Sequence, residues 1–296
     1  MTAERPLVLY HGLCADGFAA AWIVKRCHPE NAYSDAEFVP VFYGYPPPDV
    51  TGCDVLLLDF AYPRDVMRDM YEKASSLQVY DHHRSAEKQL KDLDFCYFDL
   101  ERSGAMLAWM EVCGREEPQG IPYYRSAWLP AYIQDRDLWR WELRLSKEVS
   151  ASISSYPFTF EAWDELVSVG VARHARDGGS ILRYQQRLVE DFLSEGGVGA
   201  KLVGSRGIAV RGRTLVSETC HYLLQEHSWA EWAGALFRKD DGRMQLSLRA
   251  RRDDAVDVER IAVSLGGGGH KKSAAIVFDP QDDKLEPNLR DLLNAL

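Results

Sequence analysis

Asp81, His82 and His83 place one carboxylate and two imidazoles directly after an apolar run, Leu77 to Tyr80. Such a run is typical of a buried strand, and the end of a strand is where α/β proteins build ligand sites. Carboxylates hold hard divalent cations such as Mg²⁺ and Mn²⁺, and imidazole is a good ligand for transition metals. The triplet therefore predicts part of a metal site.

Other acidic and histidine residues also follow apolar runs. They are His11 and Asp16 after Pro6 to Tyr10, Asp59 after Val55 to Leu58, and Asp135 with Asp137 after Tyr132 and Ile133. Strand ends of one sheet can gather such side chains at a shared edge. Carboxylates and imidazoles gathered in this way could hold one divalent cation or two neighbouring ones. The pattern therefore indicates a metal site for one or two ions.

Strand-like and helix-like segments alternate along the chain. Strands are expected at 7–10, 55–58 and 77–80, and helices at 17–27, 63–75, 85–91, 103–112, 127–133, 162–169 and 181–193. In the last third, strands are expected at 207–210, 234–238 and 244–249, with helices at 217–226 and 258–265. This alternation predicts an α/β fold with a mainly parallel N-terminal sheet flanked by helices.

Length and composition predict two domains. The chain has 296 residues, of which 46% are hydrophobic and 27% charged, and a domain usually takes about 100 to 200 residues. A boundary is expected between positions 145 and 200. No apolar run approaches the roughly 18 residues of a membrane span, and the first residues lack a signal-peptide pattern. We therefore expect a cytoplasmic protein without membrane contact.

Cysteine spacing and net charge exclude further classes of site. The six cysteines are scattered without a CxxC pair, so they indicate neither a disulfide framework nor a zinc site built from thiolates. The formal net charge of −10 argues against broad binding to long nucleic acid, which needs clustered Lys and Arg. Any nucleotide substrate is expected to be short.

A second signal is the run of four glycines that precedes His270. Glycines without a Cβ allow backbone N–H groups to approach an anion closely, so Gly267, Gly268 and Gly269 predict a phosphate-binding loop with a histidine beside it. A flexible hinge is the alternative. The apolar segments on both sides, 261–265 and 273–277, favour a loop between packed elements.

Five motifs together resemble the DHH phosphoesterases with their associated C-terminal domain. They are YHGLCADGFAAAW, LLLDF, VYDHHRSA, YIQDRDLW and SLRARRDDAVDVERIAVSLGGGGHKKSAA. The resemblance that they indicate, taken in order and at plausible spacing, extends over most of the chain. The resemblance implies a metal-binding catalytic domain at 1–150, a helical linker at 151–199 and a smaller α/β substrate-binding domain at 200–296, with the active site between the two domains.

The resemblance also implies roles for single residues. Asp59 would bridge two Mn²⁺ ions, with His11 on one ion and Asp16 and His82 on the other, and either Asp135 or Asp137 would complete the second site. Asp81 would orient its neighbours. His83 and Arg249 would hold the scissile phosphate, while the glycine loop and His270 would hold the far end of the substrate. Mg²⁺, Zn²⁺ and Fe²⁺ are alternatives to Mn²⁺.

Position 14 departs from the resemblance, because Cys14 stands where the first motif usually has a further Asp. A thiolate ligand is softer than a carboxylate and favours Zn²⁺ or Fe²⁺ over Mn²⁺. The simpler alternative is an inert cysteine and a more weakly held first metal.

The function expected from these features is metal-dependent hydrolysis of phosphodiester bonds in short oligonucleotides or dinucleotides. One alternative is a phosphoanhydride hydrolase that acts on polyphosphate or pyrophosphate. The other is a non-catalytic relative that binds nucleotides, against which the presence of His11, Asp16, Asp59, His82 and His83 argues. The oligomeric state is not predicted.

Overall fold

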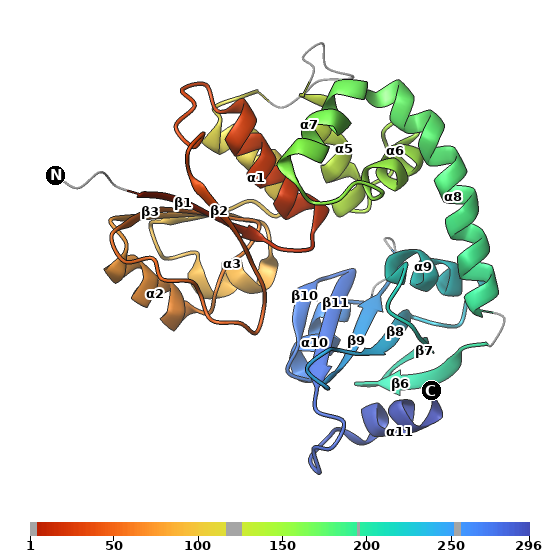
Figure 1. Cartoon of the computed structure of the whole chain (residues 1–296). Coiled ribbons are helices and arrows are strands. Elements are labelled where there is room, and N and C mark those ends of the chain that lie inside the picture. Colours follow the sequence, from red (N-terminus) through yellow and green to blue (C-terminus); the bar gives the residue numbers. More distant parts are fainter. Residues whose placement is uncertain (1–4, 117–125, 194–195, 252–255) are drawn as a thin grey trace. The chain divides into compact units, whose positions relative to one another are not determined.

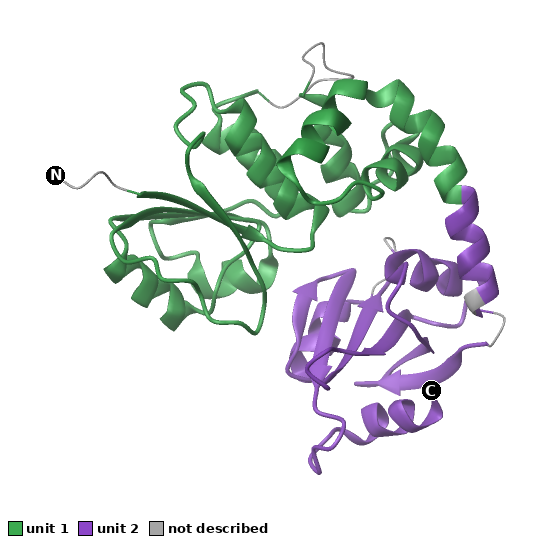
Figure 2. Cartoon of the chain, in the orientation of Figure 1, with its two compact units in different colours: residues 1–182 green, residues 183–296 purple. Residues whose placement is uncertain are grey.

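The computed structural model describes residues 5–116, 126–193, 196–251 and 256–296 (Figure 1). Part of the fifth motif, residues 252–255, lies outside them. The chain divides into two compact units, residues 1–182 and 183–296, with the boundary inside one long helix, α8 (Val171–Leu193) (Figure 2).

Unit 1 is built on a sheet of five strands in the order β2-β1-β3-β4-β5, and every neighbouring pair is parallel. Its strands are β1 (Arg5–His11), β2 (Glu37–Val41), β3 (Cys53–Leu58), β4 (Ser76–Asp81) and β5 (Cys96–Phe98). The predicted parallel sheet is confirmed. The apolar pattern did not predict β2 and β5, which are the two edge strands. An edge strand has only one paired side, and this is why Pro40 is tolerated in β2.

Helices cover both faces of this sheet. The helical elements of unit 1 that precede α8 are α1 (Ala15–Cys27), α2 (Arg64–Lys73), α3 (Arg84–Leu90), α4 (Gly104–Leu107), the π-helical turn η1 (Ala108–Val112), α5 (Trp128–Asp137), α6 (Ser146–Ile153) and α7 (Phe160–Val169). Helices α2 and α3 lie on one face, and α1 and α5 lie on the other (Figure 1), where α4 shares the apolar cluster of α1.

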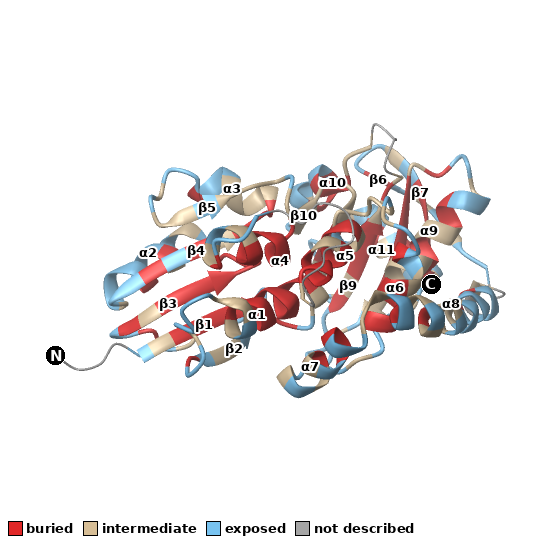
Figure 3. Cartoon of the chain, turned by 90° about the horizontal axis from the view of Figure 1, so that it is seen from above, coloured by how far each residue is buried: buried red, intermediate tan, exposed pale blue. Residues whose placement is uncertain are grey.

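The near-continuous apolar sequence of β3 follows from this double cover. Leu56 and Leu58 pack toward α1, whereas Val55 and Leu57 pack toward α2. Side chains of a strand alternate between the two faces, so a strand covered on both sides must be apolar at every position. Strands β1 and β3 and helix α1 are accordingly buried over most of their length (Figure 3).

The strand order changes direction between β1 and β3. From β1 the chain passes through α1 to β2 on one side, and then returns to β3 on the other side. The crossover helices α1 and α2 therefore leave the sheet on opposite faces, which opens a crevice at the carboxyl ends of β1 and β3. His11 ends β1, and Asp59 directly follows β3.

Unit 2 contains a six-stranded mixed sheet in the order β10-β11-β9-β8-β7-β6, in which only β7 and β8 are parallel. Its strands are β6 (Val198–Leu202), β7 (Ser205–Arg211), β8 (Trp232–Arg238), β9 (Met244–Arg249), β10 (Gly268–His270) and β11 (Ser273–Phe278). Helices α10 (Val258–Ser264) and α11 (Pro287–Ala295) pack on one face, and α9 (Val216–Glu226) packs on the other.

The glycine run of unit 2 is part of this packed structure. Gly266 has a positive φ of 80° and ends α10, and the N–H of Gly267 donates to the carbonyl of Ala262 at 2.8 Å. A Cβ on Gly267 would lie 2.1 Å from the carbonyl oxygen of Ala275 on β11. Glycine is thus required here by a helix end and by close packing of two backbones, which a flexible hinge would not need.

Within the described part of the chain, no helix combines the length and the apolar character that a membrane crossing requires.

Candidate metal centre

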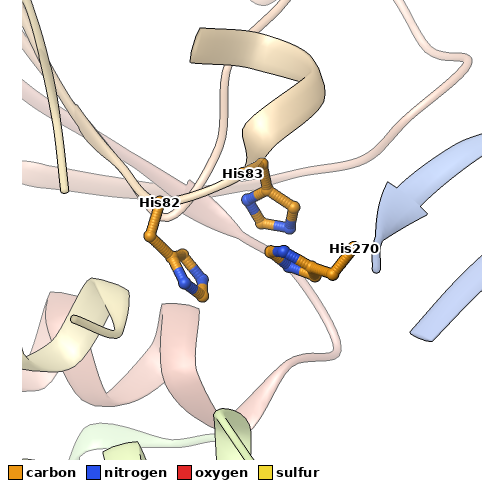
Figure 4. A group of neighbouring side chains, drawn as sticks. All are labelled: His82, His83 and His270. Atoms are coloured by element: carbon orange, nitrogen blue, oxygen red, sulfur yellow. The ribbon is translucent and has the colours of Figure 1, made fainter. Parts of the chain in front are cut away.

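The carboxyl ends of β1, β3 and β4 bring His11, Asp59, Asp81, His82 and His83 together at one edge of the sheet in unit 1. These three strands are neighbours, and each of the five residues ends one of them or follows it within two positions. Figure 4 shows the His82 and His83 side chains, which leave the backbone between β4 and α3. Residues 70 positions apart in the sequence thus meet because parallel strands end at the same edge.

Asp59 lies at the centre of the group, and each of its carboxylate oxygens has a different neighbour. Oδ1 lies 3.0 Å from Nε2 of His82, and Oδ2 lies 3.3 Å from Nδ1 of His11. The residue is 1% exposed, and its φ of 56° puts it in the left-handed region, which is uncommon for residues other than glycine. Strain of this kind persists only where the surrounding structure enforces it, and it is often found at functional sites.

Asp16 and Asp137 extend the group on the His82 side. The Oδ2 atoms of both carboxylates lie 3.6 Å from Nε2 of His82. One ligand atom from each of these three residues falls within 4.8 Å of the other two, which is the spacing of a cation site. The side chain of Asp137 is 28% exposed, whereas that of Asp16 is 1% exposed, so the group is open on the Asp137 side.

The structure separates the two acids that the sequence left as alternatives. Asp137 is the one that joins His82, as described above. Asp135 instead accepts hydrogen bonds from the backbone N–H of Glu142 at 2.9 Å and of Leu143 at 3.4 Å. Its carboxylate therefore holds the loop that follows α5.

Asp81 positions both histidines of the triplet. Its Oδ1 accepts hydrogen bonds from the backbone N–H of His82 at 2.7 Å and of His83 at 3.3 Å, and it lies 2.6 Å from Nδ1 of His83. Asp81 is fully buried. A carboxylate that holds Nδ1 fixes the orientation of the ring and makes the imidazole more basic.

Gly104 is a site residue that sequence reasoning missed. A Cβ at this position would lie 2.4 Å from the Cβ of Asp59, so no larger residue fits there. The N–H groups of Gly104 and Ala105 donate to the two oxygens of Asp16 at 2.6 and 2.9 Å. The start of α4 thus fixes Asp16. Ser103 is the sequence signal that could have indicated this helix start, because serine is a preferred helix N-cap and its side chain accepts a hydrogen bond from the N–H of Met106.

Tyr43 was also missed. It follows β2 and is 48% exposed, and its ring lies against Phe60 with centroids 4.3 Å apart. The same ring contacts His11 at 5.4 Å and His83 at 6.1 Å. A half-exposed aromatic ring therefore borders the histidines. The aromatic segment FYGY at 42–45 is the signal that could have indicated it.

The predicted substrate residues of unit 2 lie at the ends of β9 and β10. Arg249 donates from Nε and Nη2 to Oγ of Ser217 on α9, at 3.2 and 3.1 Å. His270 ends β10 and pairs with Ser273 on β11, while Gly268 and Gly269 pair with Ala275 and Ala274. The N–H of Gly267 donates a hydrogen bond to the carbonyl of Ala262 in the same unit.

The charges of the centre shift several pKa values. Burial opposes ionisation of Asp59, but the imidazoles of His11 and His82 overcome it and hold the pKa of this carboxyl well below its usual range. Burial likewise opposes the charged form of His82, yet the carboxylates of Asp59, Asp137 and Asp16 raise its pKa to about 10. Burial, with help from Asp59 and Asp137, raises the pKa of Asp16 well above its usual value.

The residues present fit divalent cations. A buried carboxylate, two histidines and two further acids supply the oxygen and nitrogen ligands that Mn²⁺, Mg²⁺ and Zn²⁺ accept. Among the described residues, Oδ2 of Asp59 has no hydrogen-bond partner although it is buried. A buried carboxylate oxygen without a hydrogen bond is costly unless a cation compensates it.

Comparison with known proteins yields distant likenesses. No family model matches the chain. An uncharacterized protein of Acanthamoeba polyphaga mimivirus is 25% identical over 294 residues, which is 92% of this chain and 67% of that protein.

Three solved structures also align with the chain. A pGpG-specific phosphodiesterase, PggH, from Vibrio cholerae has 12% identity and a TM-score of 0.49, and the alignment covers 99% of both chains. RecJ from Thermus thermophilus in complex with Mg²⁺ has 16% identity and a TM-score of 0.44 over 99% of this chain and 49% of RecJ. An uncharacterized protein from Helicobacter pylori has 13% identity and a TM-score of 0.41, with 99% and 98% covered. Likenesses of this level assign no activity.

The separation of Asp137 from Asp135 predicts different metal affinities for two matched variants. Asp137→Asn removes a charge beside His82, so we expect Mn²⁺ affinity, measured by calorimetry, to fall at least about tenfold. Asp135→Asn keeps an oxygen for the backbone N–H of Glu142. It should lower the unfolding free energy by about 1 kcal/mol and leave the affinity unchanged. If Asp135→Asn lowered the Mn²⁺ affinity and Asp137→Asn did not, Asp135 would be the metal ligand and the assignment of Asp137 would be wrong.

The pKa of His82 predicts the pH dependence of metal binding. With a pKa of about 10 in the chain alone, His82 is protonated at neutral pH, and a cation must displace that proton to reach the nitrogen. Affinity for Mn²⁺ should therefore rise as the pH increases toward 10, by up to about tenfold per pH unit for each proton released. Calorimetry in buffers of different ionisation enthalpy measures the released protons. Mn²⁺ binding without proton release would contradict the assignment of His82 as a metal ligand.

Proposed function

We propose that this chain is a metal-dependent phosphodiesterase of the DHH type that cleaves short oligonucleotides or dinucleotides. The observation that carries the proposal is the position of Asp59. One of its oxygens faces His82, with Asp16 and Asp137, and the other faces His11. A carboxylate with donors on both sides is suited to bridge two cations, as the motif resemblance implies.

The ligand groups divide between two positions. Asp16, His82 and Asp137 would hold one cation together with Oδ1 of Asp59, and His11 would hold the other together with Oδ2. Divalent cations bound there lower the pKa of a coordinated water and neutralise charge on phosphoryl oxygens. With water as the nucleophile, the chain needs no nucleophilic side chain of its own.

His83 is the residue we assign to the scissile phosphate. Burial lowers its pKa, but the adjacent carboxylate of Asp81 more than compensates, so the pKa of His83 is raised above its usual value. The imidazole therefore keeps its positive charge at a higher pH than an ordinary histidine. An imidazolium held by Asp81 at Nδ1 is oriented to donate a charge-assisted hydrogen bond to a phosphoryl oxygen.

Tyr43 supports a nucleotide substrate over polyphosphate or pyrophosphate. Its half-exposed ring borders His11 and His83, where the group attached to a bound phosphate would lie. An aromatic ring can stack on a nucleobase, whereas a chain of phosphates gains nothing from it. The roles of Arg249 and His270 in substrate binding remain predictions. Both residues belong to unit 2.

The bridging role of Asp59 predicts the effect of Asp59→Asn. The amide keeps the size of the side chain but loses the charge shared by two cations. We expect kcat/KM for a dinucleotide with Mn²⁺ to fall by more than about 100-fold, which is about 2.7 kcal/mol. Asp54→Asn, at the other end of the same strand, is the matched control, because the Asp54 carboxylate accepts a hydrogen bond from Ser76 and belongs to none of the candidate metal groups among the described residues. A folded Asp59→Asn protein with wild-type turnover would refute the proposal.

The position of Tyr43 predicts a substrate-dependent effect of Tyr43→Ala. Loss of stacking worth about 1 to 3 kcal/mol should raise KM for a dinucleotide by roughly 5- to 150-fold. Hydrolysis of tripolyphosphate, where it occurs, should not change, and Tyr43→Phe should behave like the wild type. Tyr45→Ala is the control, since Tyr45 is also exposed and contacts Phe42 instead. Equal losses on both substrates would favour the phosphoanhydride alternative.

A further inference from the structure

The thiol of Cys14 lies in the same group of side chains as His11 and Asp59. Cys14 precedes α1 with an extended backbone, and Leu13 before it has a positive φ of 55°. This tight turn between β1 and α1 returns the chain toward the strand end. As a result, one ligand atom from each of His11, Cys14 and Asp59 lies within 4.8 Å of the other two.

A second observation points to a cation at this position. Oδ2 of Asp59 is the oxygen on the His11 side, and it is buried without a hydrogen-bond partner in the part of the chain that the structure describes. Oδ1, on the opposite side, lies 3.0 Å from His82. A buried carboxylate oxygen that accepts no hydrogen bond and lies next to a histidine and a thiol is an expected environment for a metal ion.

The surroundings of Cys14 differ from those of the packing cysteines. Cys53, Cys113 and Cys220 are buried in the apolar clusters of the two units. Cys14 belongs to none of the apolar clusters found among the described residues. His11 and Asp59 lie beside it instead, so membership of an apolar cluster does not explain a cysteine at this place.

We propose that the centre is a mixed-metal site in which Cys14 selects the first cation. Cys14, His11 and Asp59 offer sulfur, nitrogen and oxygen, a set that suits a thiophilic cation such as Zn²⁺ or Fe²⁺. Asp16, His82 and Asp137 offer mainly carboxylate oxygen, which suits a harder cation such as Mn²⁺. The thiol proton passes to solvent when the sulfur–metal bond forms. This inference rests on the proposed function for the existence of two cations.

Cobalt substitution tests the sulfur ligand without any assay of turnover. The full chain is stripped of metal and titrated with Co²⁺, and a thiolate ligand then gives an intense near-ultraviolet charge-transfer band. We expect this band in the wild type and in Cys27→Ser, and no band in Cys14→Ser. Cys27 is the matched control because it ends the same helix and lies outside the cluster. A band that survives in Cys14→Ser would overturn the inference.

Metal content supplies a second and independent measurement. After dialysis against Mn²⁺ in large excess over Zn²⁺, the wild type should still retain one Zn²⁺ per chain, with Mn²⁺ at the other position, because a thiolate strengthens the preference for Zn²⁺. Cys14→Asp should lose Zn²⁺ affinity by about 10- to 100-fold and take up Mn²⁺ at both positions. Two Mn²⁺ ions in the wild type would overturn the inference.

The outcomes separate this inference from the proposed function. Dinucleotide turnover without the charge-transfer band would leave the phosphodiesterase proposal intact and refute the role of Cys14. A band that depends on Cys14 in a protein without turnover would support the thiolate ligand and refute the proposed function. Circular dichroism of each variant establishes that it is folded before the metal measurements are compared.

Discussion

The buried carboxylate of Asp59 is the constraint around which unit 1 organises its site. It directly follows the central strand of a five-stranded sheet, at 1% exposure, and its backbone is in the left-handed region. Burial of an isolated carboxylate is costly, and here the imidazoles of His11 and His82 offset that cost from opposite sides. His11 ends β1 and His82 directly follows β4, so the two strands on either side of β3 bring both histidines to Asp59.

The same carboxylate limits what can stand beside it. Gly104 is required because any Cβ there would overlap Asp59. With no side chain at that position, the start of α4 comes close enough for its N–H groups to hold Asp16. Asp16, in turn, lies within reach of His82. One close approach between a helix and a strand end thus sets the spacing of three ligand groups from distant parts of the chain.

Without a cation, the side chains of the candidate metal centre compensate the negative charges of its carboxylates only in part. Burial and the neighbouring acids raise the pKa of Asp16, while the histidines lower that of Asp59, so the two carboxylates differ in how readily they ionise. Burial, with Asp59 and Asp137, also raises the pKa of the Cys14 thiol. A divalent cation stabilises all of these groups in their ionised forms at once, and this is the physical reason to place cations here. In the arrangement that we propose, the acids would be metal ligands, and His83, oriented by Asp81, would contact the substrate.

The apolar runs and the polar residues at their ends were enough to predict the parallel sheet and to collect most of the candidate ligands. Hydrophobic pattern and strand-end position are local properties of the sequence. They did not predict the short or half-exposed edge strands β2 and β5, whose apolar signal is weak. They also could not separate Asp135 from Asp137, because both follow the same apolar run. Only the helical turn of α5 and the loop after it decide which acid faces His82. The contacts of Gly104, Tyr43 and Cys14 join segments distant in sequence, so tertiary packing alone determined them.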